Sequence, residues 1–350
     1  MLLPSKKISL VLFSLFAYCC VSIAQQWHTT IDILHPPQNT KLLGIKNLLI
    51  VNNAVQQPDN FGHANYHDSK SLGYESVDLS LSVKYLLFTL ANQLETSREF
   101  DYVGLVDQTQ NTNGSFYVKK YLTKEQIQQL CHDYQADAAL VLNSLSQYDR
   151  QGYYEGEDMH YYTYLDAYLS SSWTLQTPSG SQQIINFSDT LYWENDDRTI
   201  TDAFQGLPNR KQALLDMCNY SAERFAQLFL PQWATVDRYL YENKDTLISE
   251  GIKQFTYMHW QKSYDKFLEA YNNASKNSKV TLSAAYAAAN LALVSEIIGN
   301  LSQSRQWASN AADKFSQIKG SDALQQRVNM LYYRRQIDQR IIEQQKFSSK

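Results

Sequence analysis

The stretch YLDAYLSSSWTLQTPSGSQQIINFSDTLYWEN, residues 164–195, decides how this 350-residue chain is expected to fold. In its first half, alternate positions are apolar or small: Ala167, Leu169, Ser171, Trp173 and Leu175. A period of two residues is typical of a strand with one buried face. The run Pro178-Ser179-Gly180 favours a turn, after which the chain returns as a second strand. We therefore predict an antiparallel hairpin here.

Strands and helices alternate before this hairpin. The segments 46–53 (KNLLIVNN), 100–106 (FDYVGLV) and 136–145 (ADAALVLNSL) are short and apolar, which indicates buried strands. Residues 77–97 place apolar side chains along one helical stripe. Thr123 and Gln126 have the spacing of a capping box, which predicts a second helix. Residues 58–76 are polar and are interpreted as a loop.

After the hairpin, Pro208 is expected to open a helix, and residues 233–242 (WATVDRYLYE) to close the domain as a strand. This order predicts an α+β domain over residues 27–242, with a mixed sheet and flanking helices. From residue 243 the composition shifts to Ala, Gln, Asn and Leu, and the periodicity becomes helical. We predict an all-α, tetratricopeptide-like domain over residues 243–350.

The prediction of repeats depends on small and aromatic residues at fixed spacing. The positions 0, +12, +16 and +19 of a tetratricopeptide unit are matched by Gly251, Ser263, Phe267 and Ala270. A second unit is matched by Ala292, Ser304, Ala308 and Ala311. The alternative is an ordinary helical bundle in which this spacing has no meaning. Either architecture favours a docking role.

The amino terminus predicts export. Lys6 and Lys7 precede an apolar run from Ile8 to Ile23, and Ser22-Ile23-Ala24 has the pattern of a signal-peptidase site. We expect residues 1–24 to be a signal peptide and the protein to be periplasmic or associated with the outer membrane. The alternatives are a lipid anchor on Cys19 or Cys20 and an uncleaved anchor. No second apolar stretch approaches spanning length, so no transmembrane domain is expected in the mature chain.

Charge and motifs exclude several functions. The formal net charge is −4 and no basic block occurs, which argues against a nucleic-acid partner. The phosphate-binding glycine motifs, H-E-x-x-H and G-x-S-x-G do not occur, so we expect no cofactor, no catalytic residue and no enzymatic activity of the common kinds. After removal of the signal, Cys131 and Cys218 remain. They could pair as a disulfide or stay separate as buried thiols.

One weak metal candidate occurs within the predicted loop. His63 and His67 lie four residues apart beside Asp68, a spacing that would place both imidazoles on one face of a helix. The flanking residues indicate a loop, and a third His or Cys is not nearby. A solvated loop is therefore the favoured interpretation.

A tyrosine-rich acidic segment, residues 153–166, is the first choice for a partner-binding surface. Exposed tyrosines are good contact residues. The candidate binding residues are Tyr153, Tyr154, Glu155, Glu157, Asp158, Tyr161 and Tyr162. The alternatives are the polar rim of a hairpin, and an exported glycan hydrolase that uses these carboxylates. A hydrolase requires two carboxylates that face each other, which adjacency in sequence does not provide.

The order of elements resembles the small amino-terminal domain of the translocation protein TolB and of curli-secretion (CsgG-like) lipoproteins. The resemblance includes Gln135-Ala136-Asp137-Ala138 before the third strand and the Thr177-Pro178-Ser179-Gly180 turn. The whole chain is also similar to uncharacterised exported proteins of Bacteroides-type bacteria. The resemblance implies a binding or assembly role in the cell envelope, through a protein partner, and transfers no catalytic residue.

Overall fold

The computed structural model describes residues 25–276 and 280–348, which form two compact units. The first unit covers Pro36–Gln232 and contains a seven-stranded sheet. Its elements are a short 3-10 helix, Thr40–Leu42, then β2 Asn47–Asn52, β3 His63–His67, β4 Lys70–Tyr74, α2 Ser82–Thr96, β5 Tyr102–Val106, α3 Lys124–Asp133, β6 Ala138–Glu155, β7 Tyr161–Gln176, β8 Gln182–Asp197, α4 Ile200–Gln205 and α5 Arg210–Gln227. The α+β prediction is confirmed.

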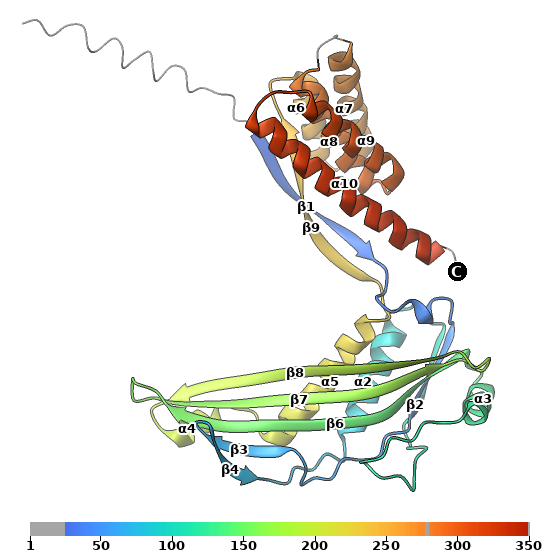
Figure 1. Cartoon of the computed structure of the whole chain (residues 1–350), viewed down its shortest axis with the longest axis vertical. Helices are drawn as coiled ribbons and strands as arrows, with labels where there is room; N and C mark the ends of the chain where they lie inside the picture. Colours follow the sequence, from blue (N-terminus) through green and yellow to red (C-terminus); the bar gives the residue numbers. More distant parts are fainter. Residues whose placement is uncertain (1–24, 277–279, 349–350) are drawn as a thin grey trace, which may run out of the picture. The chain divides into compact units, whose positions relative to one another are not determined.

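The long strand β6 organises the sheet (Figure 1). Along one edge, its first part pairs in parallel with β2 and its second part with β3. Along the other edge, β7 pairs antiparallel with β6 over almost its whole length, and β8 continues the sheet beyond β7. β5 and β4 lie beside β2 and β3. The predicted hairpin is therefore present as β7 and β8, and it forms one side of a mixed sheet in which β8 pairs with β7 alone.

Alternate residues of β2 point into two different hydrophobic cores, one on each face of the sheet. Leu48 and Ile50 belong to the main core, which α2 and α5 cover, whereas Leu49 and Val51 pack with α3 on the other face. The same division separates the two thiols: Cys218 of α5 lies in the main core and Cys131 of α3 in the smaller one, and both are free. Burial raises the pKa of Cys218 to about 12, so this thiol stays protonated at neutral pH.

The local predictions hold for most elements. The α2 stripe is buried at Leu86, Leu87, Leu90 and Leu94. Thr123 and Gln126 form the expected capping box at the start of α3, and Asn209, which follows Pro208, caps α5. The helix α4 was not expected, nor was the extension of β6 by ten residues beyond residue 145, the end of the predicted strand.

The interpretation of residues 58–76 as a loop is wrong. The segment contains the antiparallel pair β3 and β4, in which His63–His67 is aligned with β6. The usual apolar alternation is absent because both strands are short, β4 is mostly exposed, and the residues of β3 that are buried or half-buried are mostly polar.

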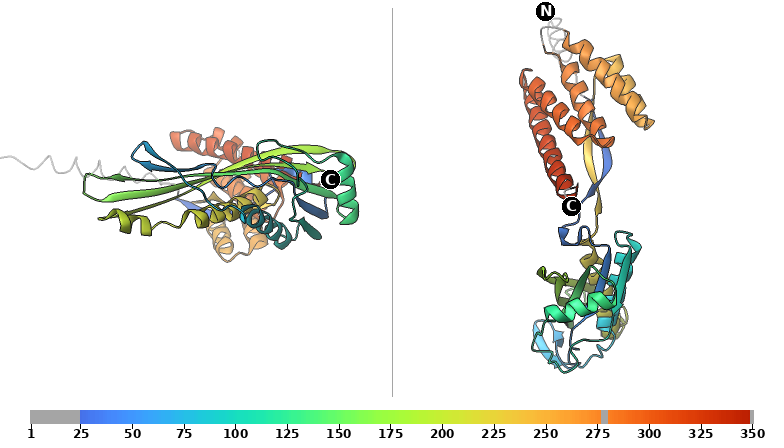
Figure 2. Two further views of the ribbon diagram at one scale, coloured as in Figure 1. Left: turned by 90° about the horizontal axis from the view of Figure 1, so that it is seen from below. Right: turned by 90° about the vertical axis from the view of Figure 1, so that its right-hand side faces the viewer.

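The second unit comprises Gln25–His35 with Trp233 onward. It contains β1 Gln25–His35, β9 Gln232–Glu242, α6 Thr246–Thr256, α7 Trp260–Ser275, α8 Leu282–Ile297, α9 Leu301–Ser316 and α10 Ser321–Ser348. β1 and β9 form a separate two-stranded ribbon (Figure 2). The strand predicted at 233–242 is therefore present, but it does not close the first domain as we expected from the 27–242 boundary: it pairs with a strand whose residues lie about 200 positions earlier.

The run of helices predicted after residue 243 is confirmed, and each helix packs on the next. The small residues selected by spacing are buried at helix contacts. A side chain at Gly251 would lie 2.5 Å from the Phe267 ring, and Ser263 Oγ donates to the Gly251 carbonyl over 2.9 Å. In the second set, Ser304, Ala308 and Ala311 are equally inaccessible.

Among the described helices, none combines the length and apolar character that crossing a membrane requires. The predicted signal peptide of residues 1–24, with Cys19 and Cys20, lies outside the described residues.

Candidate functional site

Seven tyrosines gather on one face of the sheet, opposite the face that α5 covers. Cross-strand register places neighbouring side chains on the same side, and the paired positions are Tyr148↔Tyr168, Tyr154↔Tyr162, Gly152↔Tyr164, Asp166↔Tyr192 and, from β3, Tyr66↔Gly152. We call Tyr66, Tyr148, Tyr154, Tyr162, Tyr164, Tyr168 and Tyr192 the tyrosine face. Tyr192 is 69% exposed and Tyr154 45% exposed, whereas Tyr66, Tyr162, Tyr164 and Tyr168 are half-buried.

A register shift in β6 produces this arrangement. Ala139 and Val141 point toward α3, so an uninterrupted strand would continue with odd-numbered residues on that side. The shift between Leu142 and Ser144 changes the parity, and from Ser144 onward the even-numbered residues occupy this side. α3 therefore covers the apolar end of the face, and the tyrosines follow where its cover ends.

Two pairs of tyrosine rings stack across neighbouring strands. The ring centroids of Tyr148 and Tyr168 are 4.8 Å apart with an interplanar angle of 11°, and those of Tyr154 and Tyr162 are 5.2 Å apart at 9°. These separations match the spacing between strands, about 4.8 Å. The rings consequently stand upright on the sheet, with their flat faces toward the neighbouring strand and their edges toward solvent.

A glycine leaves room for the centre of the face. A side chain at Gly152 would lie 2.5 Å from the Tyr164 hydroxyl, so the ring of Tyr164 occupies the space above this glycine. On the other side of Gly152, the Arg150 guanidinium lies 6.0 Å from the centroid of the Tyr66 ring, within the range of a cation–π contact. Arg150 is aligned with Asp166 across β6 and β7.

The electrostatics of the face disfavour extra negative charge. Burial raises the pKa of Tyr164 and Tyr168, so both hydroxyls remain neutral donors. Burial also raises the pKa of Asp166, and Glu194 adds to the effect while Arg150 opposes it. The hydrogen bond from Tyr162 to Asp158, 2.8 Å long, raises the pKa of the tyrosine and lowers that of the aspartate.

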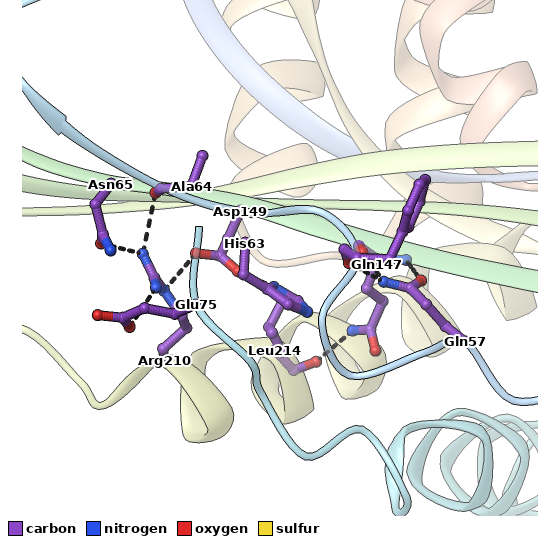
Figure 3. Close-up of polar contacts among 10 residues, drawn as sticks. Gln57, His63, Ala64, Asn65, Glu75, Gln147, Asp149, Arg210 and Leu214 are labelled. Carbon is purple, nitrogen blue, oxygen red and sulfur yellow. Dashed lines mark hydrogen bonds and ion pairs between the residues drawn. The ribbon is translucent and has the colours of Figure 1, made fainter. Parts of the chain in front are cut away.

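A buried ionic cluster fixes β3 on the inner side of the sheet (Figure 3). His63 Nδ1 lies 2.5 Å from Asp149 Oδ1, and Arg210 Nε lies 2.6 Å from Asp149 Oδ2, with all three side chains almost inaccessible. Arg210 also donates to the Ala64 carbonyl and pairs with Glu75. Because removing one partner would leave a buried charge, the cluster holds α5, β6 and β3 in one register.

The buried ionic cluster on the inner side of the sheet also positions part of the tyrosine face on the outer side. His63 is aligned with Asp149, and three residues further along the same ladder Tyr66 is aligned with Gly152. Nearby, Gln57 donates to the Gln147 carbonyl over 2.5 Å and accepts from the Gln147 amide over 2.7 Å, and the Gln147 side chain donates to the Leu214 carbonyl of α5. Slippage of β3 by one residue would therefore break the cluster and remove Tyr66 from the tyrosine face.

Comparison with protein families identifies a family whose model covers most of the sheet unit together with β9. The family model for a domain of unknown function, DUF8603, matches residues 45–241, more than half of the chain. The chain belongs to the DUF8603 family. A second domain of unknown function, DUF6340, matches residues 249–339, within the run of helices. No curated protein matches the chain in sequence.

Among solved structures, one similar chain is a homolog of neuraminyllactose-binding hemagglutinin from Helicobacter pylori. The similarity covers 55% of this chain and 84% of the other, with 10% sequence identity and a TM-score of 0.25.

In the DUF8603 domain, the candidate binding residues of the tyrosine-rich segment lie on both faces of the sheet and in a turn. Tyr154 and Tyr162 belong to the tyrosine face, and Asp158 contacts it through Tyr162. Tyr153 lies on the inner side, where its ring is 6.0 Å from that of Phe204 in α4. Tyr161 and Glu155 form the neighbouring inner pair, and Glu157 is exposed in the turn. The segment is thus a hairpin end, and its side chains do not form one surface.

Of the metal candidates, His67 lies 3.5 Å from Asp68, but the two histidines do not meet. His63 is buried against Asp149, whereas His67 is half-exposed and stacks on Tyr153 with ring centroids 4.4 Å apart. Four residues along a strand span about 13 Å, which is too far for two imidazoles to share one ion. Within residues 25–276 and 280–348, the structure brings together no group of three His, Cys, Asp or Glu side chains able to hold a metal.

Five members of the tyrosine face were not among the candidate binding residues: Tyr66, Tyr148, Tyr164, Tyr168 and Tyr192, of which Tyr164 lies within the predicted segment 153–166. The sequence holds the signal for three of them. Tyr148, Arg150, Gly152 and Tyr154 alternate before the turn, and Tyr162, Tyr164, Asp166 and Tyr168 alternate after it. A prediction of a further hairpin, with its turn between Tyr154 and Tyr162, would have placed the two series on neighbouring strands.

Proposed function

We propose that this protein is an exported, non-enzymatic binding or assembly protein of the bacterial cell envelope, and that the tyrosine face binds a protein partner. The observation that carries the proposal is an open sheet face on which seven tyrosines replace the usual small polar residues of a solvated surface. Tyrosine is enriched at protein interfaces because it combines a large apolar ring with a hydroxyl at low entropic cost.

The size of the face suits the centre of an interface. From Tyr148 to Tyr154 the strand rises about 20 Å, and the four strands β3, β6, β7 and β8 span about 15 Å across. This area is smaller than the approximately 800 Å² that each partner buries in a standard interface. The tyrosines would therefore form the energetic core, and the polar residues around them the rim.

The orientation of the rings favours a protein over a glycan. A sugar stacks on the flat face of an aromatic ring, whereas the stacked pairs direct one face of each ring to its neighbour. Ring edges and hydroxyls remain for the partner, and these suit hydrogen bonds and apolar contacts with a polypeptide.

The geometry does not favour the glycan hydrolase alternative. Glu155, Glu157 and Asp158 are exposed at the end of the hairpin. The hydrogen bond from Tyr162 lowers the pKa of Asp158, the opposite of what a general acid at neutral pH requires. A glycosidase also holds its two carboxyl groups opposite each other across the scissile bond.

The helical run extends the proposal to a second docking element. We propose that α6–α9 are divergent tetratricopeptide-like repeats, supported by the close packing of Gly251 on Phe267 and by the buried Ser304, Ala308 and Ala311 at equivalent spacing. The resemblance to amino-terminal domains of TolB and curli-secretion lipoproteins, and to exported proteins of Bacteroides-type bacteria, supports a role in the envelope.

Site-specific photocrosslinking in cells tests the tyrosine face. A photoreactive amino acid replaces Tyr192, which is 69% exposed, and in a control it replaces Tyr85, which is 38% exposed on α2, a helix that covers the opposite face of the sheet. We expect a discrete crosslinked protein from position 192, lost when Tyr154→Ser and Tyr162→Ser are added. An equal pattern at position 85, or a pattern unaffected by the two serines, would contradict the proposal.

Mass measurement of the purified mature protein tests export. Cleavage after Ala24 predicts an amino terminus at Gln25, whereas a diacylglyceryl group on Cys19 or Cys20 would identify a lipoprotein. A chain that retains Met1 and remains in the cytoplasmic fraction would refute export.

A further inference from the structure

A cavity of about 700 Å³ lies within the helical unit, beside β1. We call it the β1 groove. One wall is β1 itself, from Trp27 to Leu34, and the opposite wall includes Phe255 of α6, Trp260 of α7, Ile297 of α8 and Arg340 of α10. The lining is mainly apolar, and the volume lies within the range of ligand-binding pockets.

The β1 wall is the edge of a strand. Side chains alternate between the two faces of a strand, so one face alone would contribute every second residue. Eight consecutive residues, 27–34, line the groove, with Trp233 and Leu240 of β9 beside them, so we infer that main-chain atoms at the edge of β1 form part of the wall. β1 pairs with β9 along one edge, and no other described strand pairs with it.

This edge lacks the features that protect free strand edges. Soluble proteins commonly place lysine, proline or a bulge on an exposed edge to prevent pairing with other chains. The sequence of β1, QQWHTTIDILH, contains no lysine and no proline, and it carries the β-branched residues Thr29, Thr30, Ile31 and Ile33. Trp27 and Leu34 are each 47% exposed. The composition therefore favours pairing.

A buried ion cluster lies beside the groove, and two of its residues, Glu296 and Arg340, line it. Arg238 of β9 donates to both carboxylate oxygens of Glu296 in α8, over 2.8 and 2.9 Å, and Tyr333 of α10 donates to the same carboxylate over 2.6 Å. Arg340 of α10 also pairs with Glu296. Burial opposes ionisation, but these partners hold the pKa of Glu296 below its ordinary value. The ribbon and two helices are thus tied together beside the cavity.

We propose that the β1 groove binds an extended peptide segment of a partner protein, which adds to β1 as a third strand and places alternate apolar side chains among Phe255, Trp260 and Ile297. Main-chain hydrogen bonds to a free edge supply affinity in this mode, and side-chain pockets supply specificity. Eight residues of β1 span about 26 Å, enough for a segment of similar length. The inference concerns a surface separate from the tyrosine face and does not depend on it.

A displayed library of ten-residue peptides, with alternate positions restricted to apolar residues, tests the proposal. It is selected against the purified full chain. We expect enriched peptides that bind the wild-type chain and bind Leu34→Lys at least tenfold more weakly. Leu324→Lys is the matched control, because Leu324 is also an exposed leucine of this unit, 60% exposed on α10, and does not line the groove.

Amide hydrogen exchange then identifies the mode of binding. The bound peptide should protect every second amide of residues 27–34, and N-methylation of alternate peptide bonds should weaken binding at least tenfold. Failure to enrich peptides that depend on Leu34, or binding that leaves the β1 amides unprotected, would overturn the proposal. Concentration-dependent protection of β1 without peptide, accompanied by a dimer in light scattering, would overturn it in favour of a second copy of this chain. Because the tyrosine face is intact in Leu34→Lys, either result leaves the photocrosslinking test unaffected.

Discussion

The two faces of the β6–β7–β8 sheet share one backbone and differ in what lies on them. On the inner face, α5 and α2 cover Leu169, Trp173 and Leu175, and the buried carboxylate of Asp149 pairs with Arg210 and contacts His63. On the outer face beyond α3, half-buried tyrosines stand beside Asp166, whose pKa is raised rather than lowered. The inner face is arranged for stability, and the outer face keeps features that stability does not require.

This contrast explains why we assign binding to the outer face. Large apolar rings left in contact with water gain nothing for folding unless they pack on each other, and the stacked tyrosine pairs do so only in part. A surface of this kind is retained at a small cost in stability when a partner uses it. Substitutions on the two faces should therefore affect different properties.

The largest effect is expected for Trp173→Ala on the inner face. Trp173 is 1% exposed, and its ring stacks on Phe225 of α5 with centroids 4.7 Å apart. Removing a buried aromatic side chain leaves a cavity and should lower the free energy of unfolding by about 3–5 kcal/mol. Hydrogen exchange of the β2 amides reports on the sheet unit alone and measures this loss. A change below about 1 kcal/mol would show that the inner face is not the stabilising one.

A smaller loss is expected for Asp149→Asn, which keeps the shape of the side chain and removes its charge. The substitution removes the buried ion pair of Arg210 at 2.6 Å and leaves it only the exposed Glu75 as an acidic partner, so it should lower the free energy of unfolding by about 2–3 kcal/mol. We also expect β3 to separate first, seen as faster exchange of the amides of residues 64–67. Asp78→Asn is a control, because Asp78 and its partner Lys211 are both half-exposed and such pairs contribute little. Equal losses for the two variants would contradict the special role of the buried cluster.

The sequence predicted the inner face well and the outer face poorly, for a physical reason. Burial imposes a pattern that is visible in the chain itself, as in the alternation of Ala167, Leu169 and Ser171, and the capping box of Thr123 and Gln126 is equally local. The tyrosine face depends on the register between strands and on the shift near Leu142, which the sequence of one strand does not specify.

The pairing of β1 with β9 illustrates the same principle. Residues 233–242 have a clear strand pattern, but their partner lies about 200 residues away, and nothing local identifies it. His63 is a further example: its burial depends on Asp149 and Arg210, which are brought to it by different elements. A short strand of polar residues therefore cannot be distinguished from a loop by its own sequence, because the partners that bury those residues lie far away along the chain.

A modest effect is expected for the stacked pair on the outer face. In a double-mutant cycle, Tyr148→Ala and Tyr168→Ala should each lower the free energy of unfolding by less than about 1 kcal/mol, with a coupling energy of about 0.5–1 kcal/mol from the ring contact. Urea denaturation of the four proteins measures it. Losses as large as that of Trp173→Ala would remove the distinction between the faces.

The smallest effect, and the one with opposite sign, is expected for Asp166→Asn. Burial, with a contribution from Glu194, raises the pKa of Asp166 in the folded protein. Between the unfolded and the folded pKa the native state binds more protons, so the stability of the wild-type protein falls as the pH rises through this window, and the deficit persists at neutral pH. The asparagine cannot ionise, and Asp166→Asn should therefore be the more stable protein at pH 7.

Solvent screening at this partly exposed site keeps the gain below about 0.5 kcal/mol. At a pH well below 3.8, where the wild-type carboxyl is protonated, the difference between the two proteins should disappear. Paired urea titrations at pH 7 and pH 3 measure both values, with Asp196→Asn, an exposed carboxylate on the same face of β8, as the control. If Asp166→Asn were less stable than wild type at pH 7, the carboxylate would be stabilising the sheet through Arg150, and its presence on the outer face would no longer indicate a residue kept for binding.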